Sequence, residues 1–264
     1  MVSIATWNIN SVRLRLPIVE RFLVEEGPDV LCLQEIKCQE HQFPKQPLSD
    51  LGYQYQSVHG QKGYHGVATV SRIPLKELSR HDWQANQEAR HVGVELLGAG
   101  SGIIIENVYV PAGGDEPNRD KNPKFGQKLD FLERMTKWAE GIERQTLIVG
   151  DFNTAPLESD VWNHKQLVKV VSHTPIEVAA LHEFQKAHDW VDLGRKFIPD
   201  PNRYYSWWSY RAKDWKTNDR GRRLDHMWAS PNLASKAKKH WLREDARDWE
   251  KPSDHIPLIT EFEL

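Results

Sequence analysis

Seven short apolar runs rich in β-branched residues constrain this chain most, because each has the length of a buried strand rather than of a helix. The runs are residues 2–7, 29–34, 66–71, 91–97, 103–110, 146–149 and 256–262. Helical patterns separate some of them, but others follow one another directly. This order disfavours a strictly alternating βαβ protein and favours mixed sheets covered by helices.

Three stretches between these runs have helical periodicity: residues 16–26, 124–140 and 177–189. In the second stretch the apolar positions recur every three or four residues and so line one helix face: Phe125, Leu129, Leu132, Met135 and Ala139. Residues 111–123 and 198–204 have the composition of loops. Because no Ser/Gly-rich or Pro-rich linker divides the chain, we expect one domain over residues 1–264.

The composition disfavours a general polyanion-binding protein, a disulfide-stabilised protein and a membrane protein. The net charge of −2 is not that of a general polycation, so binding to a polyanion would require local basic patches or a metal. Two cysteines, Cys32 and Cys38, are too few for a disulfide framework and fit a reducing compartment. We see no signal peptide or membrane-spanning run and therefore expect a cytoplasmic protein without a membrane partner. Nothing in the sequence demands more than a monomer.

Four polar clusters lie at the edges of the apolar runs. They are Trp7-Asn8-Ile9-Asn10, Leu33-Gln34-Glu35-Ile36-Lys37, Gly150-Asp151-Phe152-Asn153 and Ser253-Asp254-His255-Ile256. Carboxylates, amides and an imidazole at strand ends are the groups that metal-assisted hydrolysis of a phosphodiester requires. The four clusters together therefore predict a hydrolytic site.

The first three clusters offer distinct chemistry. Glu35 and Asn10 provide hard oxygen ligands of the kind that suit Mg²⁺ or Mn²⁺. Asp151 can accept a proton from water, while Asn153, two residues on, can donate a hydrogen bond to phosphate. Tyr109 ends another predicted strand and could present its phenol to the same edge. Taken singly, each also fits a structural role: a solvated strand end, an Asx turn or a packed tyrosine.

Asp225 lies within the otherwise apolar stretch 222–228, where an unpaired carboxylate would be costly. We expect His255 to be its partner, because an Asp–His pair fixes the imidazole tautomer and favours the protonated ring. His255 could then donate to a phosphate. His226, beside Asp225, is expected to be structural.

Residues 203–223 interleave basic and aromatic side chains, a pattern typical of nucleic-acid binding. The alternative is an aromatic core strand followed by a solvated basic loop. A second basic run, residues 236–240, is expected to be solvated surface.

The motifs resemble, nearly end to end, those of the exonuclease III family of abasic-site endonucleases, within the endonuclease/exonuclease/phosphatase superfamily. Besides the four clusters, the resemblance rests on Arg13, His59-Gly60-Gln61-Lys62-Gly63, Tyr109-Val110-Pro111 and Arg223-Leu224-Asp225. It implies an α/β fold, a four-layer sandwich of two packed mixed β-sheets flanked by helices. It also implies a Mg²⁺-dependent DNA repair nuclease that acts on duplex DNA. Such an enzyme would cut 5′ to abasic sites and trim 3′ ends as a 3′→5′ exonuclease and a 3′-phosphatase.

The resemblance assigns roles to individual residues. Glu35 would bind the metal, Mg²⁺ or Mn²⁺, with Asn10 and Asp254 nearby. Asp151 would orient or deprotonate water. The scissile phosphate would be held by a group of four side chains supported by Asp225: Asn8, Asn153, Tyr109 and His255.

The resemblance also predicts contacts with DNA. Trp207 and Leu224 would receive the flipped-out abasic deoxyribose, which is cheap to extrude because little stacking is lost. Four basic residues are candidates for further contacts with DNA: Lys62, Arg90, Arg211 and Arg222. The chain departs from the family at Ala112, where an Asn or Gln is common, and in the acidic stretch 113–116 that follows.

Two other functions remain open from the sequence. The same chemistry could serve another phosphodiester, such as a phospholipid, an inositol phosphate or RNA. A non-catalytic DNA-binding protein would require the loss of an essential group, and every expected carboxylate and the imidazole are present.

Overall fold

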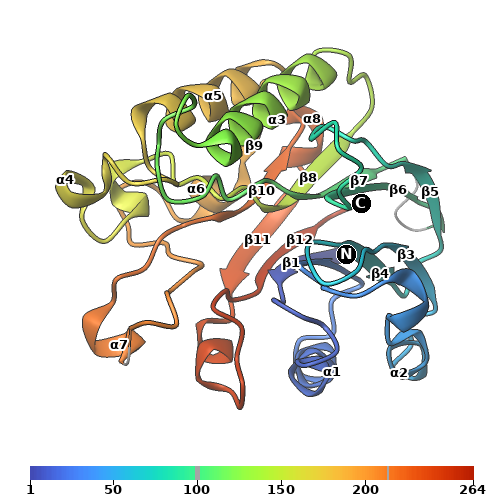
Figure 1. Cartoon of the computed structure of the whole chain (residues 1–264). Helices are drawn as coiled ribbons and strands as arrows, with labels where there is room; N and C mark the ends of the chain where they lie inside the picture. Colours follow the sequence, from blue (N-terminus) through green and yellow to red (C-terminus); the bar gives the residue numbers. More distant parts are fainter. Residues whose placement is uncertain (99–101, 213) are drawn as a thin grey trace.

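The computed structural model describes residues 1–98, 102–212 and 214–264, and shows two six-stranded sheets packed face to face between layers of helices (Figure 1). The predicted four-layer sandwich is confirmed. Helices α1 (Leu16–Glu25) and α2 (Lys45–Asp50) cover the outer face of the first sheet. Helices α3 (Pro123–Ala139) and α5 (Pro175–Lys186) cover the outer face of the second.

The first sheet has one parallel pair at its centre. Its strands, in spatial order, are β11 (Ala237–Leu242), β12 (Leu258–Phe262), β1 (Val2–Asn8), β2 (Val30–Gln34), β4 (Val67–Ser71) and β3 (Tyr55–His59). Only β1 and β2 run parallel, because helix α1 between them returns the chain to the same end of the sheet.

The second sheet repeats this arrangement. Its order is β5 (Leu75–Ser79), β6 (His91–Leu96), β7 (Ile104–Tyr109), β8 (Thr146–Asp151), β10 (Asp225–Ala229) and β9 (Val191–Asp192). Here β7 and β8 are parallel and α3 is the crossover. Both parallel pairs end at the same edge of the sandwich, where the predicted polar clusters lie.

Alternation along the strands builds the core. In β1, Ile4 faces the second sheet, whereas Ala5 and Trp7 face helix α1. The Trp7 ring meets that of Phe22 edge to face, with 5.5 Å between centroids. Burying an aliphatic or aromatic side chain of this size contributes about 1.5–3 kcal/mol, so the helix layers hold the sheets in place.

All seven predicted strands and all three predicted helices are confirmed, with ends that shift by up to three residues. Strand β10 lies in the apolar stretch around Asp225, which was predicted as a strand apart from the seven runs. Strands β3, β5, β9 and β11 were not predicted, because they are short or have polar side chains along one or both faces. Short helices connect the main elements: η1 (Glu40–Gln42), η3 (Glu158–Asp160), α4 (His164–Leu167), α6 (Leu193–Phe197), α7 (Trp215–Asn218), α8 (Pro231–Ala234) and η4 (Glu244–Asp248).

The basic run 236–240 differs from expectation. Most of it belongs to edge strand β11, with Lys238 and Lys239 exposed but His240 buried. The His240 ring bonds Tyr204 Oη and Thr260 Oγ1, each at 2.8 Å. The run is therefore solvated on one face only. Lys213, in the predicted basic-aromatic segment, lies outside the described residues.

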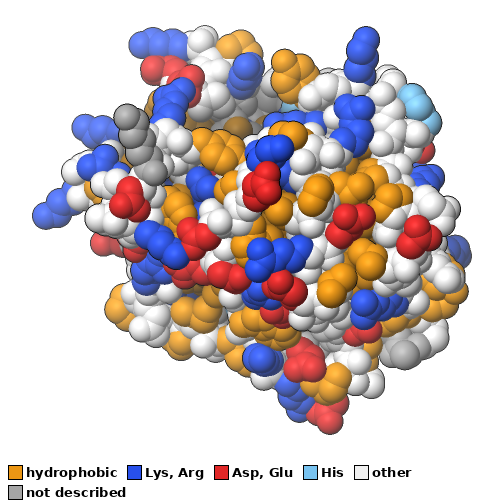
Figure 2. Space-filling model, turned by 90° about the horizontal axis from the view of Figure 1, so that it is seen from below, with side chains coloured by type: hydrophobic (Ala, Val, Ile, Leu, Met, Phe, Trp, Pro, Cys, Tyr) orange, Lys and Arg blue, Asp and Glu red, His pale blue; other side chains and the backbone are white. Residues whose placement is uncertain are grey.

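The outer face beside α1 and α2 shows Lys and Arg side chains mixed with Asp and Glu (Figure 2). This mixing agrees with the small net charge of the chain. Among the helices of the described ranges, none combines the length and apolar character that crossing a membrane requires.

Candidate active site

The candidate site lies where the carboxyl ends of both parallel strand pairs meet. Asn8 ends β1 and Glu35 follows β2, whereas Tyr109 ends β7 and Asp151 ends β8. In the second sheet Asp225 begins the antiparallel strand β10 and lies opposite Asp151. The fold thus collects side chains that are far apart in the sequence.

Glu35 is held by donors from three segments. Its Oε1 accepts from Asn8 Nδ2 at 3.0 Å and from Tyr109 Oη at 2.8 Å, and its Oε2 lies 2.8 Å from Lys37 Nζ. Burial alone would raise the pKa of Glu35, but Lys37 and the Asn8 hydrogen bond lower it below its usual value. Glu35 is therefore a carboxylate at neutral pH.

Asp151 is almost fully buried, at 1% exposure. Asn8 Nδ2 and Asn153 Nδ2 donate to its Oδ2 at 2.9 and 3.1 Å, and Asn153 N donates to its Oδ1 at 2.8 Å. Burial raises the pKa of Asp151 to about 7; His255 opposes the rise and Asp225 adds to it. A carboxyl group with this pKa can exchange a proton near neutral pH.

His255 pairs with Asp225 as expected, with Nδ1 2.8 Å from Asp225 Oδ2. Ser206 Oγ donates to the same oxygen at 2.6 Å. On the other side, His255 Nε2 lies 3.8 Å from Asp151 Oδ2. Burial would lower the pKa of His255, but Asp225 and Asp151 raise it to about 10, so the ring is a cation that points toward Asp151.

Asp254 connects the metal-ligand candidates to the pocket wall. Asn10 Nδ2 donates to its Oδ1 at 2.9 Å and Trp207 Nε1 donates to its Oδ2 at 3.0 Å. Burial alone would raise the pKa of Asp254, but His255 and the hydrogen bonds from Asn10 and Trp207 lower it below its usual value. Lys37 Nζ bridges Asn10 Oδ1, at 2.6 Å, and Glu35, so the structure already holds a cationic group between these two residues.

The backbone at this edge is tightly constrained. Asn10, Glu35 and Asn153 have φ of 48°, 49° and 50°, in the left-handed region that non-glycine residues seldom adopt. Just before Asp151, Gly150 has φ of 138°, and a Cβ there would lie 1.9 Å from Val108 O. Only glycine allows β8 to approach β7 closely enough to place Asp151 beside Tyr109.

A cavity of about 530 Å³ opens onto these side chains. Its wall includes four of the six residues predicted to contact DNA: Trp207, Leu224, Arg211 and Arg222. Arg222 lies over the Trp207 ring, with its guanidinium 5.3 Å from the ring centroid. Ala112 and Asp115, from the segment that departs from the family pattern, line the same cavity.

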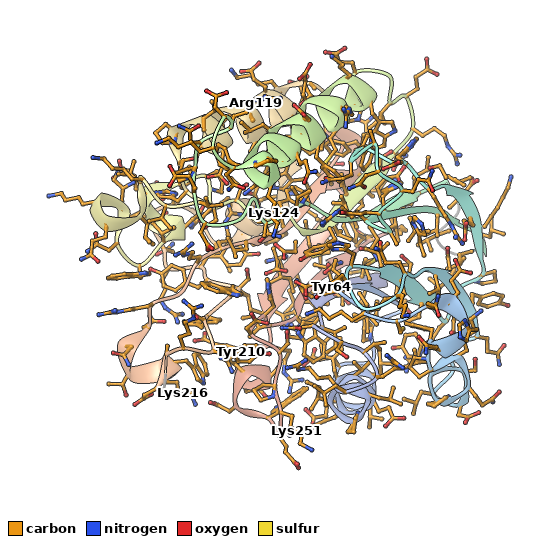
Figure 3. The ribbon with its side chains drawn as sticks, viewed as in Figure 1. Tyr64, Arg119, Lys124, Tyr210, Lys216 and Lys251 are labelled. Carbon is orange, nitrogen blue, oxygen red and sulfur yellow. The ribbon has the colours of Figure 1, made fainter. Side chains whose placement is uncertain are left out.

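The other two predicted DNA contacts lie outside this cavity. Lys62 is exposed in the turn between β3 and β4. Arg90 is only 6% exposed and packs over the Tyr109 ring at 4.9 Å, in the wall of a neighbouring cavity of about 400 Å³. Tyr64 and Lys124 line that second cavity, and both are labelled near the middle of Figure 3.

Several residues of the site were missed from the sequence. Lys37 and Ser206 contact Glu35 and Asp225, and Val170, Val171 and Ser172 line the cavity. The position of Lys37, two residues after Glu35, could have indicated that it belongs to the site. No sequence pattern indicates that residues 170–172 do, since only the fold brings them to the cavity.

Asp151, Asp225 and His255 have potential ligand atoms within 4.8 Å of one another. Both ring nitrogens of His255 face carboxylates, since Nδ1 lies 2.8 Å from Asp225 Oδ2 and Nε2 lies 3.8 Å from Asp151 Oδ2. The oxygen-rich set of Glu35, Asn10 and Asp254 offers the ligands that Mg²⁺ and Mn²⁺ prefer.

Comparison with known proteins agrees with the family resemblance of the sequence motifs. Residues 5–255 match the model of the Endonuclease/Exonuclease/phosphatase family. Exodeoxyribonuclease III of Haemophilus influenzae is 32% identical over 267 aligned positions, which cover 97% of this chain and 98% of that protein.

Two solved structures superpose over all of both chains. An AP endonuclease from Archaeoglobus fulgidus gives a TM-score of 0.92 at 32% identity. A 3′ phosphatase from Neisseria bound to a product DNA hairpin gives 0.90 at 28% identity. The chain belongs to the Endonuclease/Exonuclease/phosphatase family and, within it, to the exonuclease III family of abasic-site endonucleases.

Proposed function

We propose that this protein is a DNA repair nuclease that hydrolyses the phosphodiester 5′ to abasic sites in duplex DNA. We further propose that it trims 3′ ends as a 3′→5′ exonuclease and a 3′-phosphatase. Family membership supports this proposal, as do the solved relatives that are an AP endonuclease and a 3′ phosphatase bound to DNA. The observation that carries it is the contact chain Asp225–His255–Asp151–Asn8–Glu35. Three of its members, His255, Asp151 and Glu35, line the larger cavity.

Glu35, Asn10 and Asp254 are the proposed ligands of a divalent cation, Mg²⁺ or Mn²⁺. Such a cation supplies charge to neutralise the phosphate oxygens. The low pKa of Glu35 supports this role, because a ligand must stay ionised at neutral pH. With a cation bound, Lys37 would have to turn away from Glu35, or else Lys37 and the cation would both contact Glu35 Oε2.

Asp151 is the proposed base that orients and deprotonates the attacking water. Asn8 and Asn153 each donate to Asp151 through Nδ2, which fixes the carboxylate. Tyr109 and the protonated His255 are the proposed donors to phosphate oxygens, with Asp225 orienting His255. Hydrogen-bond donors that are already fixed where negative charge develops on the phosphate lower the activation barrier, because they need not reorganise during the reaction.

The cavity wall supports selection of a damaged nucleotide. Trp207 is partly exposed and packs with the buried Leu224 in a small apolar cluster. A sugar without a base would fit against these side chains, while a stacked nucleotide would have to be extruded at greater cost. Arg211, Arg222, Lys62 and Arg90 are proposed to interact with the DNA backbone.

We propose that the protein acts as a monomeric single domain in the cytoplasm, without a membrane partner. The family model spans most of the chain, which supports one domain.

The test is incision of a labelled duplex with one tetrahydrofuran abasic analogue, with Mg²⁺ or with EDTA, beside an undamaged blunt duplex. We expect metal-dependent cleavage 5′ to the analogue. The undamaged duplex measures the accompanying exonuclease. Cleavage of neither duplex would overturn the proposal and direct attention to other phosphodiesters.

A further inference from the structure

Lys128 is a fully buried cation behind the candidate site. It lies on the inward side of α3 with 0% exposure, where an ammonium group is costly to place. Its Nζ donates to the backbone oxygen of Asn153 at 2.7 Å and forms a close ion pair with Glu177, which is also fully buried. The ion pair therefore reaches the turn that carries Asn153, which donates to the proposed base Asp151.

Asn153 needs such support because its backbone is in the left-handed region, with φ of 50°. Its amide group is already used twice, toward Val110 O at 2.8 Å and Asp151 Oδ2 at 3.1 Å. The bond from Lys128 fixes the carbonyl of the same residue. Lys128 thus restrains the turn from behind, while Asp151 and Val110 restrain it from the cavity side.

Glu177 anchors a second wall of the cavity. Its carboxylate accepts from Ser172 N at 3.0 Å and from Thr174 N and Oγ1 at 3.2 and 2.5 Å. Ser172 lies in the cavity wall and accepts from Arg222 Nη1 at 2.7 Å through its hydroxyl. Arg222 in turn lies over Trp207.

A third segment also rests on this lysine. A Cβ on Gly113, which has φ of 89°, would lie 3.1 Å from Lys128 Cδ and 3.2 Å from Val171 Cγ1. The loop that carries Ala112 and Asp115 is therefore packed directly on the lysine stem. Three walls of the cavity meet at one side chain.

We propose that Lys128 and Glu177 form a positioning pair that sets Asn153 relative to Asp151 and holds the wall formed by Ser172 and Arg222. The pair does not touch the substrate. It acts by holding Asn153 and the proposed base Asp151 at fixed relative positions. Small misplacements of catalytic groups can cost about 10²-fold in rate. This inference rests on the proposed function, since it assigns the pair a role in that reaction.

The main variant is the double substitution Lys128→Met with Glu177→Gln. Removing both charges avoids leaving one of them buried and unpaired, which is the more destabilising change. The control is Glu106→Gln, which alters a buried carboxylate of β7 that bonds His91 Nε2 at 2.7 Å. Glu106 lies outside both described cavities.

Five quantities are measured for each protein: kcat and KM for removal of a 3′-phosphate, kcat and KM for incision at the abasic analogue, and Tm. We expect the double variant to lose at least about tenfold in kcat on both substrates, with KM changed less than about threefold. Its Tm should fall no further than that of Glu106→Gln. A kcat within twofold of the unaltered protein would overturn the inference.

Two further measurements keep the inference testable. If the double variant does not fold, Glu177→Asp is used, because it keeps the charge opposite Lys128 and shortens only the reach of the carboxylate. We expect at least a fivefold loss in kcat; a loss below twofold overturns the proposal. Hydrogen–deuterium exchange of residues 152–155 and 170–174 needs no substrate and should speed up in the double variant but not in Glu106→Gln. Inactivity of the unaltered protein on both substrates would refute the proposed function, while unchanged exchange would refute the positioning role.

Discussion

The two sheets have the same arrangement of strands but place carboxylates with different properties at their common edge. Each has a parallel pair at its centre joined by a crossover helix, with antiparallel strands outside. The first sheet delivers Glu35, whose pKa is lowered by Lys37 and Asn8. The second delivers Asp151, whose pKa burial raises to about 7. A carboxylate that stays charged suits a metal, and one that titrates suits proton transfer.

The difference arises from the neighbours of each carboxylate and not from the strands. Glu35 lies at the more open side of the edge, with an ammonium group 2.8 Å away. Asp151 is enclosed, and its nearest cation, His255, is shared with Asp225. Asn8 joins the two halves, since its Nδ2 donates to both carboxylates. Substitutions in either half of the site can therefore test this division between the two carboxylates.

The largest effect is expected for Asp151→Asn. The variant loses the base of the second sheet and keeps the cavity wall, so turnover should fall by about 10²–10⁴-fold while binding to abasic DNA changes little. Single-turnover incision and a fluorescence anisotropy titration with the same duplex measure the two properties. Normal turnover in this variant would show that the second sheet does not supply the base.

Glu35→Gln should cost less and respond to metal. The first sheet would lose a charged ligand, so activity at low Mg²⁺ should drop by about 10–100-fold and recover in part as Mg²⁺ is raised. A titration of rate against Mg²⁺ measures this, with Glu106→Gln as the control. A loss that no Mg²⁺ concentration relieves would argue against a ligand role for Glu35.

Trp207→Ala tests the wall between the two sheets. Trp207 touches Asp254 from the first sheet side and packs with Leu224 beside the second. We expect incision at the abasic analogue to fall about tenfold more than removal of a 3′-phosphate, which corresponds to roughly 1.4 kcal/mol. Equal losses on both substrates would indicate that Trp207 only supports the fold.

The last comparison concerns stability and not activity, and the effect should be alike in both sheets. Burial lowers the pKa of His226, in the second sheet, and of His240, in the first, to about 4. An unfolded histidine titrates near 6.5, so the unfolded chain takes up protons first as pH falls. Stability from these residues is complete above about pH 6.5 and is lost between there and pH 4, by about 3 kcal/mol each.

Urea unfolding at pH 8, 6.5 and 5 of the unaltered protein, His226→Asn and His240→Asn measures this loss. Each variant should show a weaker fall in unfolding free energy between pH 6.5 and 5 than the unaltered protein. Parallel curves would contradict the pKa values and the similarity of the two interiors.

The rim of the site was predictable because its residues follow apolar strands. Glu35, Asp151 and Asp225 stand next to runs whose burial is evident, and parallel strands end at the same edge. The Asp225–His255 pair was predictable from the cost of an unpaired buried carboxylate.

Other features depend on tertiary structure. Lys128 appears in the sequence as a polar position of an amphipathic helix, and only the packing of α3 on α5 and the Asn153 turn buries it. Edge strands such as β5 and β11 alternate weakly, because much of each strand faces solvent. The 170–172 segment reaches the cavity through contacts far along the chain, for which no local pattern exists.

The most direct test of the division between the sheets is the affinity for Mn²⁺ of Glu35→Gln and Asp151→Asn, measured by electron paramagnetic resonance of the free ion. We expect Glu35→Gln to weaken Mn²⁺ binding by at least about tenfold, whereas Asp151→Asn should stay within about threefold of the unaltered protein despite its lost turnover. Equal weakening in both variants would contradict this expectation, because both sheets would then hold the metal.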